Sequence, residues 1–147
     1  MTTSIESLHG PWAWAVAAQY SQAVRVGETV YTGGIGGFDA EGALVPGGFA
    51  EQARQALTNV SAVLGEFDAG MENIASMTVF VLEPADYTIF TSIRPEFLTW
   101  PFPASTAVGA GKLLVEGMLI EMSAVAIVGG RREERGGVPR PSVRQPG

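Results

Sequence analysis

The segment from residue 118 to residue 128 reads MLIEMSAVAIV, and it decides the fold. Its residues are almost all apolar or small, which is typical of a strand buried in the centre of a sheet. One residue breaks the pattern, because Glu121 places a carboxylate among apolar neighbours. Alternation along a strand puts Glu121 on the same face as Leu119, Ser123 and Val125. The segment therefore predicts both a strand and a chemically active group on it.

A carboxylate on such a strand is costly unless it is paired or hydrogen-bonded, because desolvation disfavours its charged form. The same environment favours proton exchange with a ligand, so Glu121 is the candidate general acid or base. One alternative stays open at this point. Glu121 could instead lie on an exposed strand face, or bond to a neighbouring backbone amide.

The rest of the chain supplies helices and further strands. Between Phe49 and Phe67, apolar residues recur at steps of three and four, which predicts an amphipathic helix. Gln52, Gln55 and Asn59 fall away from its apolar stripe. The other expected elements are a hairpin formed by residues 21–26 and 29–32, a strand over 74–82, a second helix that Asp86 caps and Pro95 disturbs, and strands over 104–109 and 118–128.

This order of elements is that of an α+β fold, a mixed β-sheet with both helices packed on one face. The strand over 74–82 is apolar on both faces, with Ala75 and Val79 on one side and Ile74 and Phe80 on the other. Two helices cover only one of these sides. We therefore expect self-association to cover the other.

Composition excludes several classes of function. The chain has 147 residues, no cysteine, one histidine (His9), and 15 acidic against 9 basic residues, for a net charge of −6. Without cysteine and with a single histidine, no disulfide, thiolate nucleophile or metal site is expected. The acidic charge repels phosphate backbones, so no nucleic-acid partner is expected. Residues 33–37, four of them glycine, predict a loop but match no nucleotide-binding motif, and no cofactor is expected.

The ends of the chain carry further expectations. No apolar run reaches the roughly 18 residues of a membrane span, and residues 1–9 lack the features of a secretion signal, so we expect no membrane partner and a cytoplasmic location. From Gly129 onward, Gly, Pro and Arg dominate. This composition predicts a domain over residues 1–128 followed by a flexible C-terminal tail over 129–147.

Five blocks of sequence occur in a characteristic order. They are Tyr20-Ser-Gln-Ala-Val24 with Val26-Gly27, Glu51 to Val60, Thr78 to Val81, Phe102-Pro-Ala104, and Ile120 to Ala126. Together they resemble the RidA/YjgF (UK114-like) family of reactive intermediate deaminases over residues 17–128. The resemblance implies a chorismate-mutase-like α+β fold and a homotrimer with three ligand clefts between subunits. It also implies that bound water hydrolyses a small imine or enamine there, with Glu121 assisting and Tyr20 lining the cleft.

Three positions depart from the family pattern. Family members that act on imines of amino acids carry an arginine directly after the F-P-A segment, where it binds the substrate carboxylate. Here that residue is Ser105, while Ala107 replaces a frequent cysteine and Gly33 a frequent serine. Losing the arginine would weaken carboxylate binding by about ten- to a hundredfold. We therefore expect a roomier, less cationic cleft and a substrate other than a simple amino-acid-derived imine.

The remaining candidates surround this cleft. If the strands over 104–109 and 118–128 pair, Ser105 or Thr106 lies close to the glutamate, and its hydroxyl can orient a ligand. The backbone near Gly34 can approach the ligand closely. Arg94 or Lys112 could replace the missing cation, and an exposed position is the alternative for each.

Trp12 and Trp14 either wall the pocket or anchor the core or an interface. The leading hypothesis is an enzyme that hydrolyses an imine, an enamine or a related carbonyl compound, with Glu121 as its catalytic residue. Two alternatives stay open because the arginine is missing. The chain could be a trimer that binds a metabolite without catalysis, or a specialised biosynthetic enzyme that uses the cleft for cyclisation or isomerisation.

Overall fold

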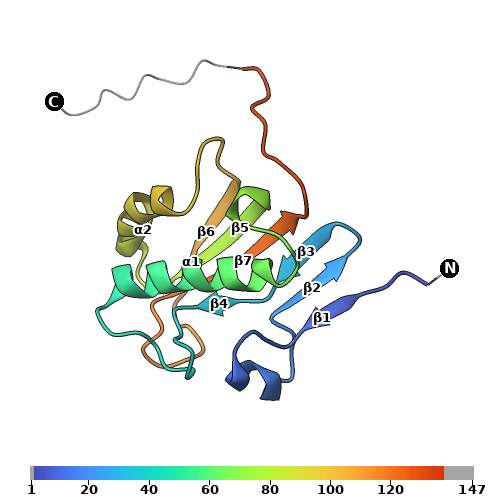
Figure 1. Ribbon diagram of the computed structural model, residues 1–147. Helices are drawn as coiled ribbons and strands as arrows, with labels where there is room; N and C mark the ends of the chain where they lie inside the picture. Colours follow the sequence, from blue (N-terminus) through green and yellow to red (C-terminus); the bar gives the residue numbers. More distant parts are fainter. Residues whose placement is uncertain (1, 138–147) are drawn as a thin grey trace.

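A computed structural model describes residues 2–137 and shows one mixed sheet with two α-helices on one face (Figure 1). The strands are β1 (Glu6–Leu8), β2 (Ala23–Val26), β3 (Thr29–Thr32), β4 (Ile35–Gly36), β5 (Ile74–Val81), β6 (Ala104–Gly109) and β7 (Ile120–Ile127). The helices are α1 (Phe49–Gly65) and α2 (Tyr87–Ile93), with short 3-10 helices η1 (Ala13–Ala17), η2 (Met71–Asn73), η3 (Pro84–Asp86) and η4 (Arg94–Glu96). The α+β fold expected from the sequence is confirmed.

The strand order is β1-β2-β3-β7-β5-β6, and the short β4 also pairs with β7. β7 runs antiparallel to β3, β4 and β5, whereas β5 and β6 are parallel. A parallel pair needs a crossover connection, and the chain makes it through α2, which brings β6 beside β5. β5 therefore separates β6 from β7. Ser105 and Thr106 do not lie next to Glu121 in the chain, contrary to the pairing considered above.

The core lies between α1 and the sheet. Leu57, Val60 and Leu64 of α1 are fully buried, as is Phe90 of α2. These residues occupy the apolar stripe that the helical periodicity predicted. Burying each such side chain contributes about 1.5–3 kcal/mol, so this layer supplies much of the stability of the fold.

Two polar residues of α1 are buried although the helical pattern placed them away from the apolar stripe. Gln52 and Asn59 are 5% and 3% exposed. Their hydrogen bonds run from Gln52 Nε2 to Gly117 O (2.9 Å), from Leu119 N to Gln52 Oε1 (2.8 Å), and from Asn59 Nδ2 to Gly36 O (2.9 Å) and Phe38 O (2.8 Å). Both amides can be buried because backbone groups of distant segments satisfy them. They fasten two loops to the helix, and both loops reach the site described below.

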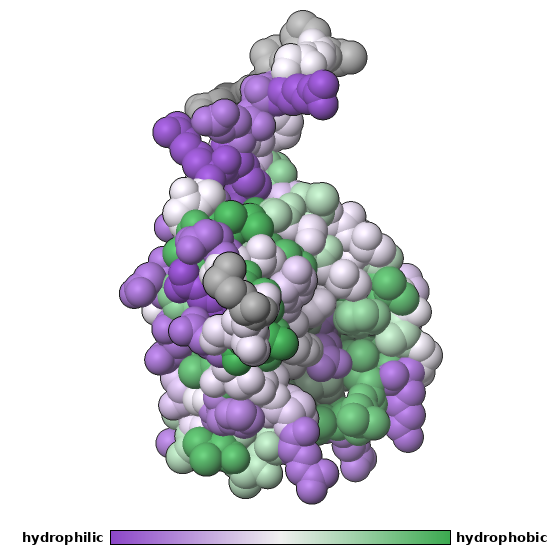
Figure 2. Space-filling view, turned by 90° about the vertical axis from the view of Figure 1, so that its right-hand side faces the viewer, coloured by the Kyte–Doolittle hydropathy of each residue, from purple (hydrophilic) through white to green (hydrophobic). Residues whose placement is uncertain are grey.

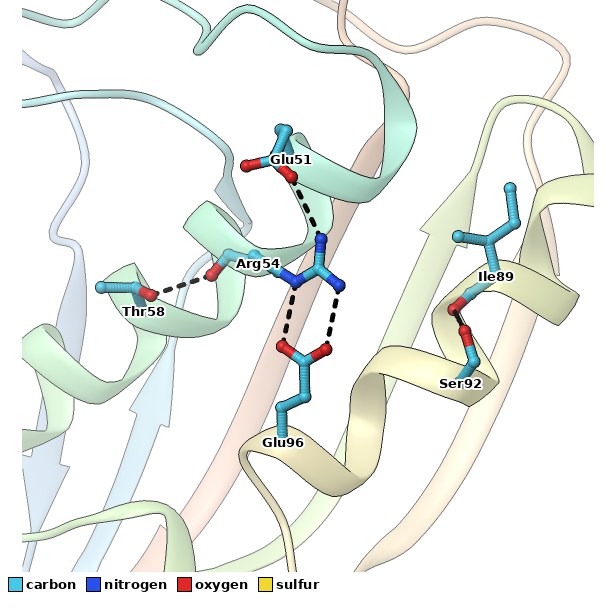
Figure 3. Close-up of polar contacts among 6 residues, drawn as sticks. All are labelled: Glu51, Arg54, Thr58, Ile89, Ser92 and Glu96. Carbon is cyan, nitrogen blue, oxygen red and sulfur yellow. Dashed lines mark hydrogen bonds and ion pairs between the residues drawn. The ribbon is translucent and has the colours of Figure 1, made fainter. Parts of the chain in front are cut away.

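The second helix is short and passes into 3-10 turns at both ends, with Pro95 inside η4. Asp86 makes no side-chain capping bond, so the predicted cap is wrong. Arg54 of α1 donates to Glu96 of η4 through Nε and Nη2, at 2.9 Å each, and to Glu51 through Nη1 at 3.0 Å (Figure 3). The hydrogen bonds from Arg54 hold the pKa of the Glu96 carboxyl below its ordinary value.

β5 carries an irregularity at its start. Its register with β7 shifts between Ile74 and Ser76. Ile74 is therefore buried and Ala75 exposed, the reverse of the strict alternation assumed from the sequence. From residue 77 onward the alternation is regular, with Val79 buried beneath the helices and Phe80 half-buried on the other face.

The short elements β1, η1, η2 and β4 were not expected from the sequence. β4 lies inside the glycine-rich segment, where Gly36 pairs with Glu121 of β7, so this segment is not wholly irregular. A Cβ on Gly37 would lie 2.6 Å from the carbonyl oxygen of Gln52. Glycine therefore lets this stretch of backbone run directly against α1.

The face of the sheet away from the helices is half-exposed and carries few charges. Tyr31 on β3 is 47% exposed and Val108 on β6 is 38% exposed. Figure 2 views the molecule from its β1 edge, and apolar side chains gather around a hollow at its lower right, on the side away from α1. Every residue of β6 is exposed, as is usual for an edge strand without a partner on its outer side.

The segment after β7 makes most of its hydrogen bonds to the domain through one arginine. Arg132 donates to the carbonyls of Met71, Glu72, Ile74, Thr99 and Pro101. Burial lowers the pKa of this guanidinium. Asn73 Nδ2 also donates to Gly130 O at 2.7 Å. The flexibility expected of residues 129–147 stays a prediction, and residues 138–147 of that tail lie outside the described part of the chain.

Candidate functional site

Glu121 lies near the start of β7, between two elements. It pairs with Gly36 of β4 on one side and with Phe80 of β5 on the other. Its side chain is on the face away from the helices, since the neighbouring Met122 and Ile120 are fully buried beneath them. Within residues 2–137, the Glu121 carboxylate has no hydrogen bond or ion pair with another side chain or backbone group. The glutamate is half-buried and open to a ligand.

A glycine makes room for this carboxylate. A Cβ on Gly34 would overlap the Glu121 carboxyl group and would lie 2.8 Å from its Cδ. Real Cβ atoms do not approach so closely, so any larger residue at position 34 would displace the carboxylate. The approach of this backbone to the site, expected from the glycine-rich sequence, is present in the fold.

A cavity of about 320 Å³ opens beside Glu121. Its lining residues are Trp12, Trp14, Tyr20, Gln22, Gly34, Ile35, Gly36, Phe38, Gly42, Asn59, Leu114, Val115, Met118 and Glu121. We call it the aromatic cavity, because four of these side chains are aromatic. Its volume is at the lower end of the range for small-molecule sites, about 300–1,000 Å³.

A second, more open cavity of about 530 Å³ lies on the other side of the glutamate. Its lining residues are Phe80, Ala110, Lys112, Leu113, Leu114 and Glu121. Glu121 and Leu114 line both cavities. The carboxylate therefore faces an aromatic cavity on one side and a cavity with one lysine on the other.

The structure brings some of the predicted site residues together. Tyr20, Gly34 and Glu121 line the aromatic cavity, as do both tryptophans. Gly33 adjoins them and donates its N–H to the carbonyl of Gln22 at 2.8 Å. Lys112 lines the second cavity.

Other candidates lie elsewhere in the chain. Ser105, Thr106 and Ala107 are exposed on β6, with β5 between them and Glu121. Arg94 donates from Nη2 to the hydroxyl of Tyr87 at 2.7 Å, and its guanidinium lies over aromatic rings of α2. It is held on the helical side of the sheet, so within one chain it does not reach the glutamate.

Sequence reasoning missed several lining residues, of which Gln22 is the most informative. Its side chain is 3% exposed, and its Nε2 has no hydrogen-bond partner. Within residues 2–137, the other buried side-chain nitrogen or oxygen without a hydrogen-bond partner is Trp14 Nε1. Gln22 lies inside one of the recognised blocks, but nothing in its spacing distinguishes a residue that lines a cavity from one on a strand edge.

The described residues contain neither a cluster of metal-binding side chains nor a membrane-spanning helix. Among residues 2–137, no three His, Asp or Glu side chains gather where they could hold a metal ion. No helix in this part of the chain combines the length and apolar character required to cross a membrane.

Comparison with solved structures defines the class of fold. A RidA protein from an Antarctic Psychrobacter superposes with a TM-score of 0.73 at 29% identity, over 86% of this chain and 99% of that one. Yeast Mmf1 superposes with a TM-score of 0.76 at 27% identity, over 84% and 98% of the two chains.

The sequence then places the chain within a family. The family model described as Endoribonuclease L-PSP matches residues 12–128. The bovine protein named 2-iminobutanoate/2-iminopropanoate deaminase is 36% identical over 78% of this chain and 84% of its own length. The human protein of that name is 38% identical over 75% and 80%. The chain therefore belongs to this family, which is the RidA/YjgF family that the sequence blocks resemble.

Proposed function

We propose that this chain hydrolyses an imine, an enamine or a related carbonyl compound next to Glu121. In the reaction, an enamine first tautomerises to its imine by moving a proton from nitrogen to carbon. Water then adds to the C=N carbon, the nitrogen accepts a proton, and the C–N bond breaks to give a carbonyl compound and ammonia. Glu121 accepts the proton of the attacking water and returns a proton to the leaving nitrogen. The substrate, one water molecule and the carboxylate together account for every atom and proton in this reaction.

The observation that carries the proposal is the unpaired, half-buried carboxylate of Glu121 at the junction of two cavities. A glutamate with a structural role would engage an arginine, a lysine or a backbone amide. Tyr20 stands at the same cavity, and its hydroxyl can orient a ligand. The names of the bovine and human relatives support the class of reaction.

The proposed active form is a homotrimer whose clefts lie between subunits. Two features support it: β6 has an open edge, and the face away from the helices exposes Tyr31 and Val108. In such an assembly, Ser105, Thr106 and Ala107 on β6 of one subunit would complete the cleft at Glu121 of the next. The cleft would then bring together Glu121 and the three β6 residues, which β5 separates within a single chain.

The proposed substrate is not a simple amino-acid-derived imine. The position after the F-P-A segment, where the family pattern has an arginine, is Ser105. Among the described residues, no lysine or arginine lines the aromatic cavity. Lys112 lines the second cavity but is exposed, so its charge is well solvated. A substrate carboxylate would therefore lack a buried cationic partner.

Replacing Glu121 by Gln tests the function. Ammonia release from freshly generated imines, neutral and carboxylated, should fall by about 10²- to 10⁴-fold, the usual contribution of a general acid or base. Glu116→Gln is the matched control, because Glu116 is exposed and lines neither cavity. The solution mass of both variants should equal that of the native assembly.

Three results would count against the proposal. Unchanged turnover by Glu121→Gln would remove the glutamate from the mechanism. No ammonia from any imine, with retained binding, would favour a trimer that only binds a metabolite. Conversion of a bound imine or carbonyl compound to an isomer or a ring without ammonia release would favour a biosynthetic role.

A further inference from the structure

The aromatic cavity has walls suited to a flat ligand. Trp12 and Trp14 are stacked, with ring centroids 5.5 Å apart and an angle of 8° between their planes. Phe38 packs at an angle against Trp14, with centroids 5.8 Å apart. Gly42 adopts φ +85°, and a Cβ there would lie 3.1 Å from the ring of Trp14. Packing on several sides fixes the Trp14 indole, so the aromatic side chains form a rigid apolar wall of the cavity.

A buried amide without a partner lies in the same cavity. The backbone of Gln22 is fixed on both sides, because its N–H donates to Leu8 O at 2.7 Å and its carbonyl accepts from the N–H of Gly33 at 2.8 Å. Its side chain makes no hydrogen bond within residues 2–137, although it is 3% exposed. Buried amides in folded proteins nearly always have partners, so an exception on a cavity wall indicates a place for a ligand atom.

The missing partner is a hydrogen-bond acceptor. Gln22 Nε2 and Trp14 Nε1 are both N–H donors, and both lack an acceptor. The amide can therefore present its NH₂ group to a carbonyl oxygen in the cavity.

The charge of the ligand follows from the same residues. Glu121 is the one ionisable carboxylate among the described lining residues, and no lysine, arginine or histidine accompanies it. Within this chain, an anion in the cavity would meet a like charge and no counter-charge, which is unfavourable at low dielectric. An uncharged ligand meets no such penalty.

We propose that the aromatic cavity selects uncharged, planar imines or enamines with a ring-sized apolar body and a neutral carbonyl oxygen, which accepts a hydrogen bond from Gln22. This selection rests on the function proposed above and specifies its substrate class. The ring packs on the tryptophan wall. The C=N carbon then lies toward Glu121, where water is activated.

Stable products of the reaction test this selection without catalysis. Methyl phenylglyoxylate is neutral and carries a planar benzoyl group; phenylglyoxylate adds a negative charge, and methyl pyruvate lacks the ring. Titration calorimetry on the intact protein should show that methyl phenylglyoxylate binds at least about tenfold more tightly than either of the others. Phenylglyoxylate binding as tightly as its ester, or methyl pyruvate binding as tightly as methyl phenylglyoxylate, would overturn the proposal.

A pair of variants tests the role of the amide. Gln22→Leu keeps the volume of the side chain but removes its hydrogen bond, and it should weaken binding of methyl phenylglyoxylate by about five- to tenfold. Gln19→Leu is the control, because Gln19 is exposed and does not line the cavity. Equal affinity of the native protein and Gln22→Leu would remove Gln22 from recognition. Circular dichroism verifies folding, and the comparison of ligands on the native protein does not depend on the variant.

Measurements of ammonia release distinguish a failure of the ligand selection from a failure of the hydrolytic function on which it rests. The imine of methyl phenylglyoxylate and 2-iminopropanoate are compared by ammonia release. If neither releases ammonia above the rate without protein while the ester still binds, the hydrolytic function fails and the ligand selection stands. If 2-iminopropanoate is hydrolysed and the aromatic ester neither binds nor reacts, the ligand selection and the exclusion of amino-acid-derived imines both fail, and imine hydrolysis itself stands.

Discussion

The two faces of β7 differ in what they do. Met122, Ala124 and Ala126 point toward the helices and are at most 3% exposed. Glu121 and Ser123 point the other way and are half-buried. One strand thus contributes alternately to the core and to the site, because side chains alternate with a period of two residues. Stability and chemistry should therefore respond separately to substitutions at neighbouring positions.

The largest expected effect is on the helical face. Met122→Ala removes a fully buried side chain beneath α1 and should lower the free energy of unfolding by about 2–5 kcal/mol. Urea unfolding measures the change. Ser123→Ala, one residue away on the other face, should change it by less than about 1 kcal/mol. Equal losses for the two variants would contradict the separation of the faces.

Asn59 connects the helical layer to the site, so its loss should affect both. Asn59→Ala leaves the carbonyls of Gly36 and Phe38 without their donor and should cost about 1–3 kcal/mol. Ligand affinity should fall as well, since both carbonyls belong to residues that line the aromatic cavity. In Gln55→Ala the two hydrogen bonds that Asn59 donates remain. A loss of ligand affinity as large as that of Asn59→Ala would therefore argue against a role for these two bonds.

A substitution at Gly34 tests only the face of β7 that carries Glu121. Gly34→Ala should change stability by less than about 1 kcal/mol, because the clash is with a movable side chain, the carboxyl group of Glu121. Ammonia release should nevertheless fall by at least about tenfold, since the carboxylate is displaced. Gly65→Ala is the matched control, because nothing lies within 4 Å of the added Cβ. Native turnover in Gly34→Ala would contradict a requirement for this carboxylate position.

The smallest expected effect concerns the ion pair between α1 and η4. The Glu96 pKa is lower in the folded than in the unfolded chain, so the pair stabilises the fold above the ordinary pKa of glutamate. This contribution is lost as the pH falls through the folded-state value. Melting temperatures of the native protein and Glu96→Gln should therefore differ slightly at neutral pH and converge in acid, below the folded-state pKa of Glu96. A difference that grows in acid would contradict this sign, and Glu66→Gln serves as an exposed control.

The fold could be predicted because its main elements carry strong periodic signals. The apolar stripe between Phe49 and Phe67 marked α1, and the apolar run around Glu121 marked β7. The hairpin formed by β2 and β3 was readable from Gly27, which adopts φ +59° in the turn. These signals are local, so the sequence alone reveals them.

The rest depends on contacts between distant segments. Asn59 and Gln52 are buried by hydrogen bonds to loops 21 to 67 residues away along the chain, and no helical period encodes such partners. The aromatic wall forms because η1 brings Trp12 and Trp14 against the loop around Phe38. Gln22 could not be singled out, because the absence of a partner is a property of the folded chain.

The bonds of Arg132 affect how the protein can be shortened. A version of the chain that ends at Val128, where the family match ends, would keep every strand and helix described above. It would nevertheless leave the carbonyls around η2 and the loop before β6 without the guanidinium that binds them. Minimal versions for crystallisation or fusion should therefore include Arg132 and the residues that hold it in place.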